Sequence, residues 1–437
     1  MLFSKCVSAI LVLATSVSSS ILPIRRSSTC TVKSSNGTSD DSPAFLAAAK
    51  ACAKDATIVF SAGVDYNIFT PVNATLNNVE IKLLGNLHLP QNITQVQLLV
   101  NTTAATWFII KGSHVSLTGT TNVSTGWIYS YGQQWWDANP VNGTGILNRP
   151  HLMQFNVSTG TITNFKSSKP IAWGVSILGN NIHVKNSLVE ASTTGGFPFN
   201  TDGFDIAATN VLVEDSVIIN GDDAFAVTSG SENVTISRAF IGGPGCHGTS
   251  IGSLGQNQGL FATVSNVLFT DVTAVGSVYG ARFKSWVGGQ GLAKNITWRN
   301  YNVHNVTYPI YVTQNYINQG NAQTQIENGA VTGRPNNASV LMRDFTWSNW
   351  KGDINTYNRG DRSCVTDPCW YDVPGADGTQ AAVIQCANAT SCENFSMSNI
   401  QIVPQSYPQS LPSIICQNVA AAPSLGFVCQ NGTFTAH

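Results

Sequence analysis

The sequence predicts an all-β chain folded as a right-handed, single-stranded parallel β-helix, a solenoid, with a short capping helix near its N-terminus. Three observations support this prediction: the composition, a short motif that returns along the chain, and the scarcity of helical patterns. Only 10% of the 437 residues are charged, whereas ordinary globular proteins have about 25%. Glycine, asparagine, serine and threonine fill the difference, which favours a β-rich protein with many turns over a helical bundle.

The returning motif is an asparagine followed by alternating apolar and polar residues. It begins at Asn78, Asn181, Asn210, Asn233, Asn266, Asn295 and Asn394. The intervals from Asn181 to Asn295 are 29, 23, 33 and 29 residues, as expected for stacked coils of parallel strands. A sandwich or barrel would also give many short strands, but would not so naturally return the same motif at every pass. We expect each asparagine to fill a turn of left-handed or side-chain-bonded geometry.

The N-terminus has the pattern of a secretory signal peptide over residues 1–20. Lys5 supplies a positive charge, residues 6–14 are apolar, and residues 15–20 are small enough for cleavage. The apolar run is shorter than the roughly 20 residues of a spanning helix. We therefore expect a secreted, extracellular protein without membrane association, whose residues 27–437 form one continuous β-helix domain.

Residues 39–55 carry the one convincing helical pattern. Serine and aspartate at residues 39–42 offer an N-terminal cap, Pro43 suits a first turn, and an alanine-rich stretch follows. A helix at this place is suited to cover the open edge of a β-core.

The cysteines are clustered and form plausible local pairs. Nine remain once Cys6 leaves with the signal. We predict the pairs Cys30–Cys52, Cys364–Cys369, Cys386–Cys392 and Cys416–Cys429, which leave Cys246 unpaired. No cysteine or histidine spacing indicates zinc.

Residues 126–137 are densely aromatic and allow two interpretations. One is a wall on which sugars stack. The other is core packing at a corner of a coil, which we favour for Trp135 and Trp136.

Polar residues stand at similar intervals in the middle of the chain. The clusters are Asn200/Asp202/Asp205, Asp222/Asp223, residues 245–248 around His247, Arg282/Lys284, and Gln314/Asn315/Tyr316. The steps from Asp202 through Asp222, His247 and Arg282 to Tyr316 are 20, 25, 35 and 34 residues, near one coil each. Because stacked strands lie roughly 4.8 Å apart, these residues would line one face as a ladder.

Such a ladder fits hydrolysis of a glycosidic bond in an acidic polysaccharide. One protonated carboxylic acid gives its proton to the leaving oxygen, and another carboxylate activates water or attacks the sugar. Arg282 and Lys284 would pair with a carboxylate on the substrate. A calcium site at the three aspartates is the rival chemistry, but the adjacent cations make the cluster less anionic. The formal net charge of −1 predicts no attraction to nucleic acid or anionic membranes.

At these residues the sequence resembles glycoside hydrolase family 28, the polygalacturonase family, from about residue 57 to about 400. The resemblance is carried by Asn200-Thr201-Asp202, Gly221-Asp222-Asp223, Gly245-Cys246-His247-Gly248, Arg282-Phe283-Lys284 and Tyr316. It implies a parallel β-helix that hydrolyses the α-glycosidic bonds of galacturonic acid in pectin with inversion. It implies neither a metal nor another cofactor, and we expect a monomer.

The resemblance also implies a role for each matching residue. Asp222 would be the general acid, with His247 tuning it, and Asp202 and Asp223 would hold and activate the water. On the binding side, Arg282 and Lys284 would bind the uronate carboxylate, Tyr316 would contact the sugar, and Asn200 would orient a neighbour or the substrate.

Within the family, the longer loops and the Phe197-Pro198-Phe199 segment before Asn200 favour an exo-polygalacturonase-like member. A xylogalacturonan hydrolase or an exo-rhamnogalacturonan hydrolase stays open, because the catalytic residues would be alike. A pectate lyase and an inactive carbohydrate-binding β-helix are further alternatives.

Overall fold

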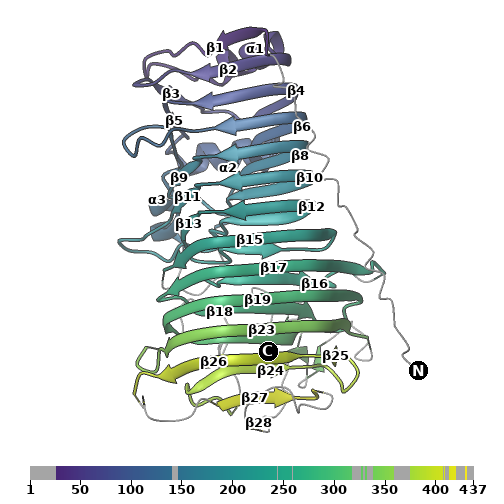
Figure 1. Ribbon diagram of the computed structural model, residues 1–437. Helices are drawn as coiled ribbons and strands as arrows, with labels where there is room; N and C mark the ends of the chain where they lie inside the picture. The colour runs from purple at the N-terminus through teal and green to yellow at the C-terminus, as the bar shows by residue number, and fades with distance from the viewer. Residues whose placement is uncertain are drawn as a thin grey trace, which may run out of the picture.

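The chain winds as a tall stack of coils, with α1 at one end and the C-terminal strands at the other (Figure 1). The computed structural model describes residues 26–139, 146–243, 245–257, 259–316, 338–358, 375–406, 408 and 413–419, and the backbone of 326–327, 330–331 and 429–430. Within these residues, 26 strands join into one sheet whose neighbours pair in parallel, while β21 and β22 form a separate antiparallel pair. This is the predicted right-handed parallel β-helix.

Three stacks of strand segments run along the coils. The first stack contains the initial parts of the early long strands and continues through β14 (Phe225–Val227), β16 (Thr249–Leu254), β18 (Tyr279–Trp286), β20 (Tyr308–Tyr316), β24 (Gln380–Gln385), β27 (Ser413–Gln417) and β28 (Cys429–Gln430). The second stack contains β1 (Ser28–Thr31), β2 (Lys54–Phe60), β4 (Val72–Leu83), β6 (Thr106–Thr118), β8 (His151–Thr163), β10 (Val175–Lys185), β12 (Phe204–Glu214), β15 (Ser231–Gly242), β17 (Ala262–Val275), β19 (Gly291–Val306), β23 (Val340–Ile354), β25 (Cys392–Glu393) and β26 (Ser396–Pro404).

The third stack contains β3 (Asp65–Asn67), β5 (Asn86–His88), β7 (Trp127–Tyr129), β9 (Lys166–Ser168), β11 (Leu188–Glu190) and β13 (Val217–Ile219), and continues in the ends of the later long strands. The isolated pair is β21 (Ile326–Glu327) and β22 (Ala330–Val331). The helices are α1 (Ser42–Ala51), α2 (Ile93–Thr102) and α3 (Gly132–Ala138).

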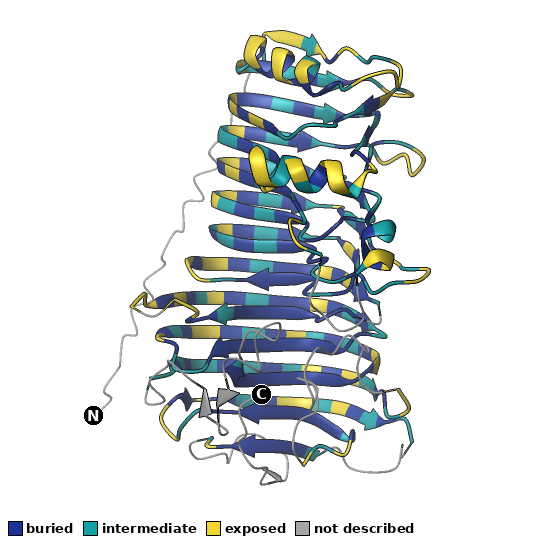
Figure 2. Ribbon diagram, turned by 180° about the vertical axis from the view of Figure 1, so that it is seen from behind, coloured by how far each residue is buried: buried dark blue, intermediate teal, exposed yellow. Residues whose placement is uncertain are grey.

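Buried residues line the strands of the coils (Figure 2), and most of the buried side chains in the described part of the chain are apolar. They alternate with outward residues along the strands, as in β12, where Phe204, Ile206 and Val213 are fully buried. Like residues stack from coil to coil: the Trp298 and Trp347 rings lie 5.4 Å apart and parallel. The core is therefore one continuous column of matched layers.

The asparagines of the returning motif occupy one corner of the coils, as predicted. All seven have positive φ, between 53° and 56°. Their side chains also bond along the stack, with Asn210 donating to Asn181 at 3.1 Å and Asn233 donating to Asn210 at 3.1 Å. Left-handed backbone costs most residues about 1–2 kcal/mol, and asparagine tolerates it because its side chain bonds locally. Both parts of the prediction, the backbone geometry and the side-chain bonding, are confirmed.

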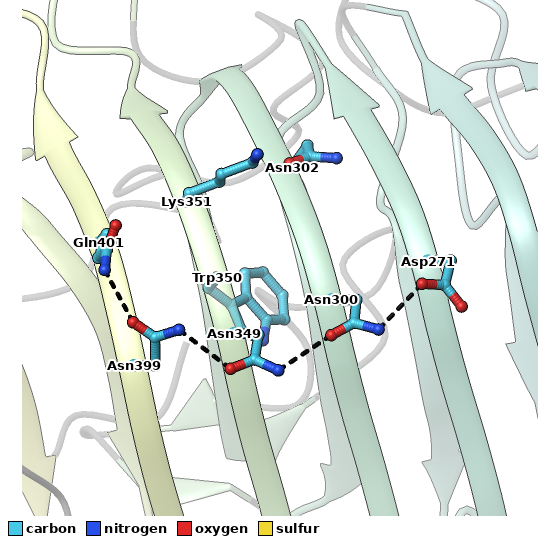
Figure 3. A pocket seen from close by; sticks show the side chains of 8 residues that line it. All are labelled: Asp271, Asn300, Asn302, Asn349, Trp350, Lys351, Asn399 and Gln401. Carbon is cyan, nitrogen blue, oxygen red and sulfur yellow. Dashed lines mark hydrogen bonds between the residues drawn. The ribbon is translucent and has the colours of Figure 1, made fainter.

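A second ladder of amides stands at the next corner (Figure 3). Asn300 donates to Asp271 at 2.9 Å, Asn349 to Asn300 at 3.0 Å, and Asn399 to Asn349 at 3.0 Å. All four residues again have positive φ. This ladder was not predicted, because its members do not begin a shared motif.

The capping helix is present but shorter than predicted. Helix α1 covers Ser42–Ala51 and buries Phe45 against the first coils, whereas the prediction extended it over 39–55. Residues 54–60 form β2 instead, with Asp55 at the left-handed corner. The predicted cap is confirmed only in part. Asp40 Oδ1 accepts from the Ser42 amide at 2.9 Å, at the first residue of the helix. Asp41, at the N-cap position, makes no side-chain cap, and its carboxylate accepts from the Ser35 and Asn67 amides at 2.6 and 2.9 Å. Its acidic side chain ties loops together rather than starting the helix.

Two further helices were not predicted. Helix α2 starts at an Asn92 cap that accepts from the Gln95 amide at 3.0 Å. Helix α3 lies within the aromatic stretch and buries Trp135 and Trp136, which confirms their core role. Trp127 and Tyr129 in the same stretch are partly exposed, so the sugar-stacking wall stays a prediction.

The cysteine predictions hold where the structure describes them. Cys30–Cys52 and Cys386–Cys392 are disulfides, and Cys246 is a buried free thiol. Cys416 is disulfide-bonded, while the pair Cys364–Cys369 and the predicted signal peptide lie outside the described residues. None of the described helices is both long and apolar enough to traverse a bilayer.

Asn349 tests the second ladder. Asn349→Ala should lower the free energy of unfolding by about 2 kcal/mol, because alanine disfavours the left-handed backbone and loses two side-chain bonds. Asn349→Gly should lose less, since glycine adopts this backbone freely. The midpoint of urea denaturation measures both, and equal midpoints for the two variants would contradict the backbone argument.

Candidate active site

The predicted site residues lie on successive coils of the first stack: five of them come just before a strand, Arg282 and Lys284 lie within β18, and Tyr316 ends β20. Asp202 precedes β12, Asp222 and Asp223 precede β14, and His247 precedes β16. The connecting loops are bonded to each other, because the Gly203 amide donates to the Asp223 carbonyl at 2.9 Å and the His247 amide to the Asp222 carbonyl at 2.8 Å. Parallel pairing from coil to coil therefore places one polar group above the next.

A buried asparagine holds the turn that carries the two adjacent acids. The Asn220 amide nitrogen donates to the carbonyls of Thr201, Asp222 and Asp223, each at 2.9 Å. Gly221 is needed beside it, since a Cβ there would lie 2.5 Å from the Pro198 carbonyl oxygen. The turn is thus fixed by local bonds before any substrate binds.

Asp223 is the anchor of a fully buried ion cluster. Its Oδ1 accepts from Arg282 at 2.5 Å and from the Ser250 hydroxyl, and its Oδ2 accepts from Lys284 at 2.8 Å. Burial raises the pKa of Asp223, but the guanidinium and the ammonium outweigh it and hold that pKa below its ordinary value. Asp223 therefore stays ionised at any pH at which an ordinary aspartate is ionised.

Asp222 lies beside this cluster and is paired with a histidine. Its Oδ1 is 2.8 Å from Nδ1 of His247, and its Oδ2 accepts from the Asn200 amide at 3.1 Å. Burial raises the pKa of Asp222, but the charge and hydrogen bond of His247, with Lys284 and Arg282, outweigh it and lower that pKa. Asp222 and His247 are thus a hydrogen-bonded pair whose geometry allows a proton to pass between them.

Asp202 has the opposite electrostatic environment. It is buried, and its Oδ1 has no hydrogen-bond partner among the described residues. Burial, and then the charges of neighbouring carboxylates, raise the pKa of Asp202 well above its ordinary value. Asp205 lies three residues further on, within β12. Burial and the charges of Asp223 and Asp222 raise its pKa to about 7.

The cations of the cluster are covered by tyrosines. The Lys284 ammonium lies 5.4 Å from the centre of the Tyr316 ring, and the Arg282 guanidinium 4.9 Å from that of Tyr279. Tyr316 in turn packs edge-on against Trp286. All eight residues predicted for the site are thus found in one contiguous region.

Sequence reasoning missed several residues of this region. Arg149 donates to Asn200, Ser250 bonds Asp223, and Trp173 lies under the Arg149 guanidinium. Arg149 and Trp173 carry no motif signal, although arginine is scarce in this chain. Ser250 lies three residues after His247, but a single serine there gives no chemical cue.

Asp222, Asp223 and His247 have potential ligand atoms within 4.8 Å of one another, which is close enough for a metal ion. The donor set does not fit a divalent cation, because both oxygens of Asp223 already bind Arg282 and Lys284. A cation would have to displace two buried positive charges.

The hollow of Figure 3, about 350 Å³, is a different place on the molecule. It is lined by residues of β17, β19, β23 and β26, and none of these strands carries an aspartate of the candidate active site.

Clustered carboxylates beside a histidine and two buried cations, on a parallel β-helix, define a polysaccharide-cleaving glycoside hydrolase. The sequence model of glycosyl hydrolases family 28 matches residues 55–360, and the chain belongs to that family.

Relatives agree with this class, and a solved structure shares the fold. The chain is 51% identical over 416 residues to a probable exopolygalacturonase C of Aspergillus terreus, covering 94% of both proteins. It is 51% identical over 419 residues to the protein of the same name in Aspergillus niger, covering 94% of this chain and 93% of the relative. The endo-xylogalacturonan hydrolase of Aspergillus tubingensis superposes with a TM-score of 0.72 at 22% identity, covering 92% of this chain and 99% of that one. That likeness shows the shared fold.

The ion cluster predicts unequal costs for the two adjacent acids. Asp223→Asn should lower the free energy of unfolding by about 3–5 kcal/mol, because it leaves Arg282 and Lys284 buried without their counter-ion. Asp222→Asn should cost clearly less, since His247 can become neutral. Urea denaturation of the two variants compares them, and an equal loss would argue against Asp223 as the anchor.

Asp205 predicts a pH dependence of stability. Its folded pKa of about 7 lies above the ordinary value of roughly 3.9. The stability that its proton contributes is therefore complete below about pH 4 and lost as the pH rises through 7. In Asp205→Asn the urea midpoint should fall less between pH 4 and pH 8 than in the parent. The exposed Glu232→Gln is the control, and an unchanged slope in Asp205→Asn would contradict the assignment.

Proposed function

We propose that the protein is a secreted, monomeric exo-polygalacturonase that removes galacturonic acid from the ends of pectic chains with inversion. The observation that carries the substrate class is the buried Arg282–Lys284 pair beside the acids. The exo mode is supported by relatives named exopolygalacturonase that are 51% identical over nearly the whole chain.

The cation pair favours an anionic sugar over a neutral one. An ammonium has three donors, and Asp223 accepts a hydrogen bond from Lys284 at 2.8 Å. Within the described residues Lys284 makes no other hydrogen bond, so its remaining donors are left for a uronate carboxylate. A neutral hexose would leave this charge unmatched, so it would bind more weakly.

Asp222 acts as the general acid and His247 as its proton partner. The Asp222 pKa is low in the free protein because of the positive charges around it. A bound uronate carboxylate would neutralise part of that charge and raise the Asp222 pKa. A proton held by His247 would then move to Asp222 and on to the glycosidic oxygen.

Asp202 and Asp223 hold the attacking water on the other side of the sugar. Asp223 is ionised, and Asp202 has an oxygen without a protein partner. Asp202 must lose its proton to accept one from water, so its raised pKa sets the acidic limb of the rate profile. Tyr316 contacts the sugar beside Lys284, and Asn200 orients Asp222.

The first experiment is a product profile on de-esterified polygalacturonan with chelator present. Release of single galacturonic acid units from the outset, with inverted anomeric configuration by NMR, supports the proposal. A ladder of oligomers would mean endo cleavage, and unsaturated products would mean a lyase. If the enzyme leaves polygalacturonan intact but hydrolyses xylogalacturonan or rhamnogalacturonan, its substrate is that other pectic polysaccharide.

The acid role of Asp222 predicts a specific loss. Asp222→Asn should lower turnover of oligogalacturonides by about 10²–10⁴-fold. It should lose much less on an aryl galacturonide whose leaving group needs no proton. Asp202→Asn is the matched variant and should fail on both substrates. If Asp202→Asn were the one spared on the aryl substrate, the acid would be Asp202.

A further inference from the structure

We propose that Arg149 is a positioning residue of the active site, which fixes the Asn200 amide so that it donates to Asp222 during proton transfer. This inference rests on the proposed function, in which Asp222 gives a proton to the leaving oxygen. Arg149 lies in the segment between α3 and β8, outside all the sequence motifs that supply the site residues from Asn200 to Tyr316.

The guanidinium of Arg149 is held from several sides. It donates to the Phe199 carbonyl at 2.7 Å and to Oδ1 of Asn200 at 2.6 Å. It also lies 5.4 Å from the centre of the Trp173 ring, against which His151 stacks in parallel at 4.4 Å. A side chain fixed in this way has little freedom left to lose when substrate binds.

This contact settles which way the Asn200 amide faces. A guanidinium only donates hydrogen bonds, so the atom that faces Arg149 must be the amide oxygen. The amide nitrogen then points to Oδ2 of Asp222, at 3.1 Å. Without Arg149, the amide could turn and present its oxygen to the carboxylate, which would repel it.

Arg149 also brings a charge that no described carboxylate neutralises directly. No ion pair joins it to an acid within the described chain, although Asp222 and Asp202 act on it through space. The charge polarises the Asn200 amide and makes it a stronger donor. As Asp222 releases its proton, the new negative charge on Oδ2 is therefore stabilised through Asn200.

Other groups also act on Asp222 and must stay constant in any test. They are His247 and Asp223 beside it, Arg282 and Lys284 on β18, and Asp202 and Asp205 at the start of β12. None of them contacts Arg149 by a hydrogen bond in the described chain.

The test compares Arg149→Met, Arg149→Lys and Asn200→Ala with the Arg149→Met/Asn200→Ala double variant. Arg149→Met should lower kcat about 10-fold with little change in KM. It should also move the alkaline limb of the kcat profile to higher pH, because a cation near the acid is lost. Arg149→Lys keeps the positive charge, so its kcat and its pH profile should lie between those of the parent and those of Arg149→Met. The double variant should be no slower than Asn200→Ala alone, since Arg149 acts through Asn200.

The control is Lys169→Met. Lys169 likewise lies over a tryptophan, 5.7 Å from the centre of the Trp136 ring, and bonds the Gln133 side chain and the Ser192 carbonyl at 3.0 Å. It does not reach Asn200, so this variant should keep the kcat and pH profile of the parent.

A measurement without substrate separates this inference from the proposed function. The pKa of His247, followed by NMR of the imidazole ring, should rise in Arg149→Met and stay constant in Lys169→Met. If the parent hydrolyses no galacturonate polymer, the proposed function fails, and this titration still decides the role of Arg149. Additive losses in the double variant, or an unmoved His247 titration, would overturn the inference.

Discussion

The pairing of each coil with the next is the constraint on which the rest of the structure depends. Parallel strands fix the distance between coils and the register of their side chains. Groups that lie 20 to 35 residues apart in sequence thereby become neighbours, as the loop of Asp202 is bonded to that of Asp223 and the loop of Asp222 to His247. The corners must repeat equally well, and asparagines with φ near 56° provide this at Asn210, Asn233 and Asn266. A slip of one residue in any coil would break both the core layers and the catalytic ladder.

The same constraint explains what could be predicted from the sequence. A motif that repeats once per coil is visible as a repeat, so the fold and the corner asparagines were predictable. The ladder from Asp202 to Tyr316 followed from the spacing together with the family resemblance.

The features that could not be predicted do not repeat from coil to coil. Helix α2 interrupts the coils once, and Arg149 reaches the site through a tertiary contact that no local pattern announces. The end of α1 was misjudged because alanine-rich sequence continues the helical pattern up to the strand that ends it.

The site is a set of like charges held together by unlike ones. Three carboxylates within one small region would repel each other strongly in a buried place. Arg282 and Lys284 neutralise Asp223, and His247 pairs with Asp222, whereas Asp202 has no ion pair among the described residues. This unequal sharing is why the pKa values of neighbouring aspartates move in opposite directions. Separation of pKa values between adjacent acids is what acid–base catalysis requires.

A substrate carboxylate changes this balance in a useful direction. In the free protein the positive charges around Asp222 hold its pKa below the ordinary value and favour its ionised form. In the proposed mechanism, a uronate that binds Lys284 adds the negative charge that the cluster lacks, so a proton becomes more stable on Asp222. On this proposal the acid forms when a uronate is bound, and a neutral sugar would not form it. Selectivity for uronates and readiness of the acid then have one electrostatic cause, in which Asp223 serves as the fixed counter-ion and the substrate as the variable one.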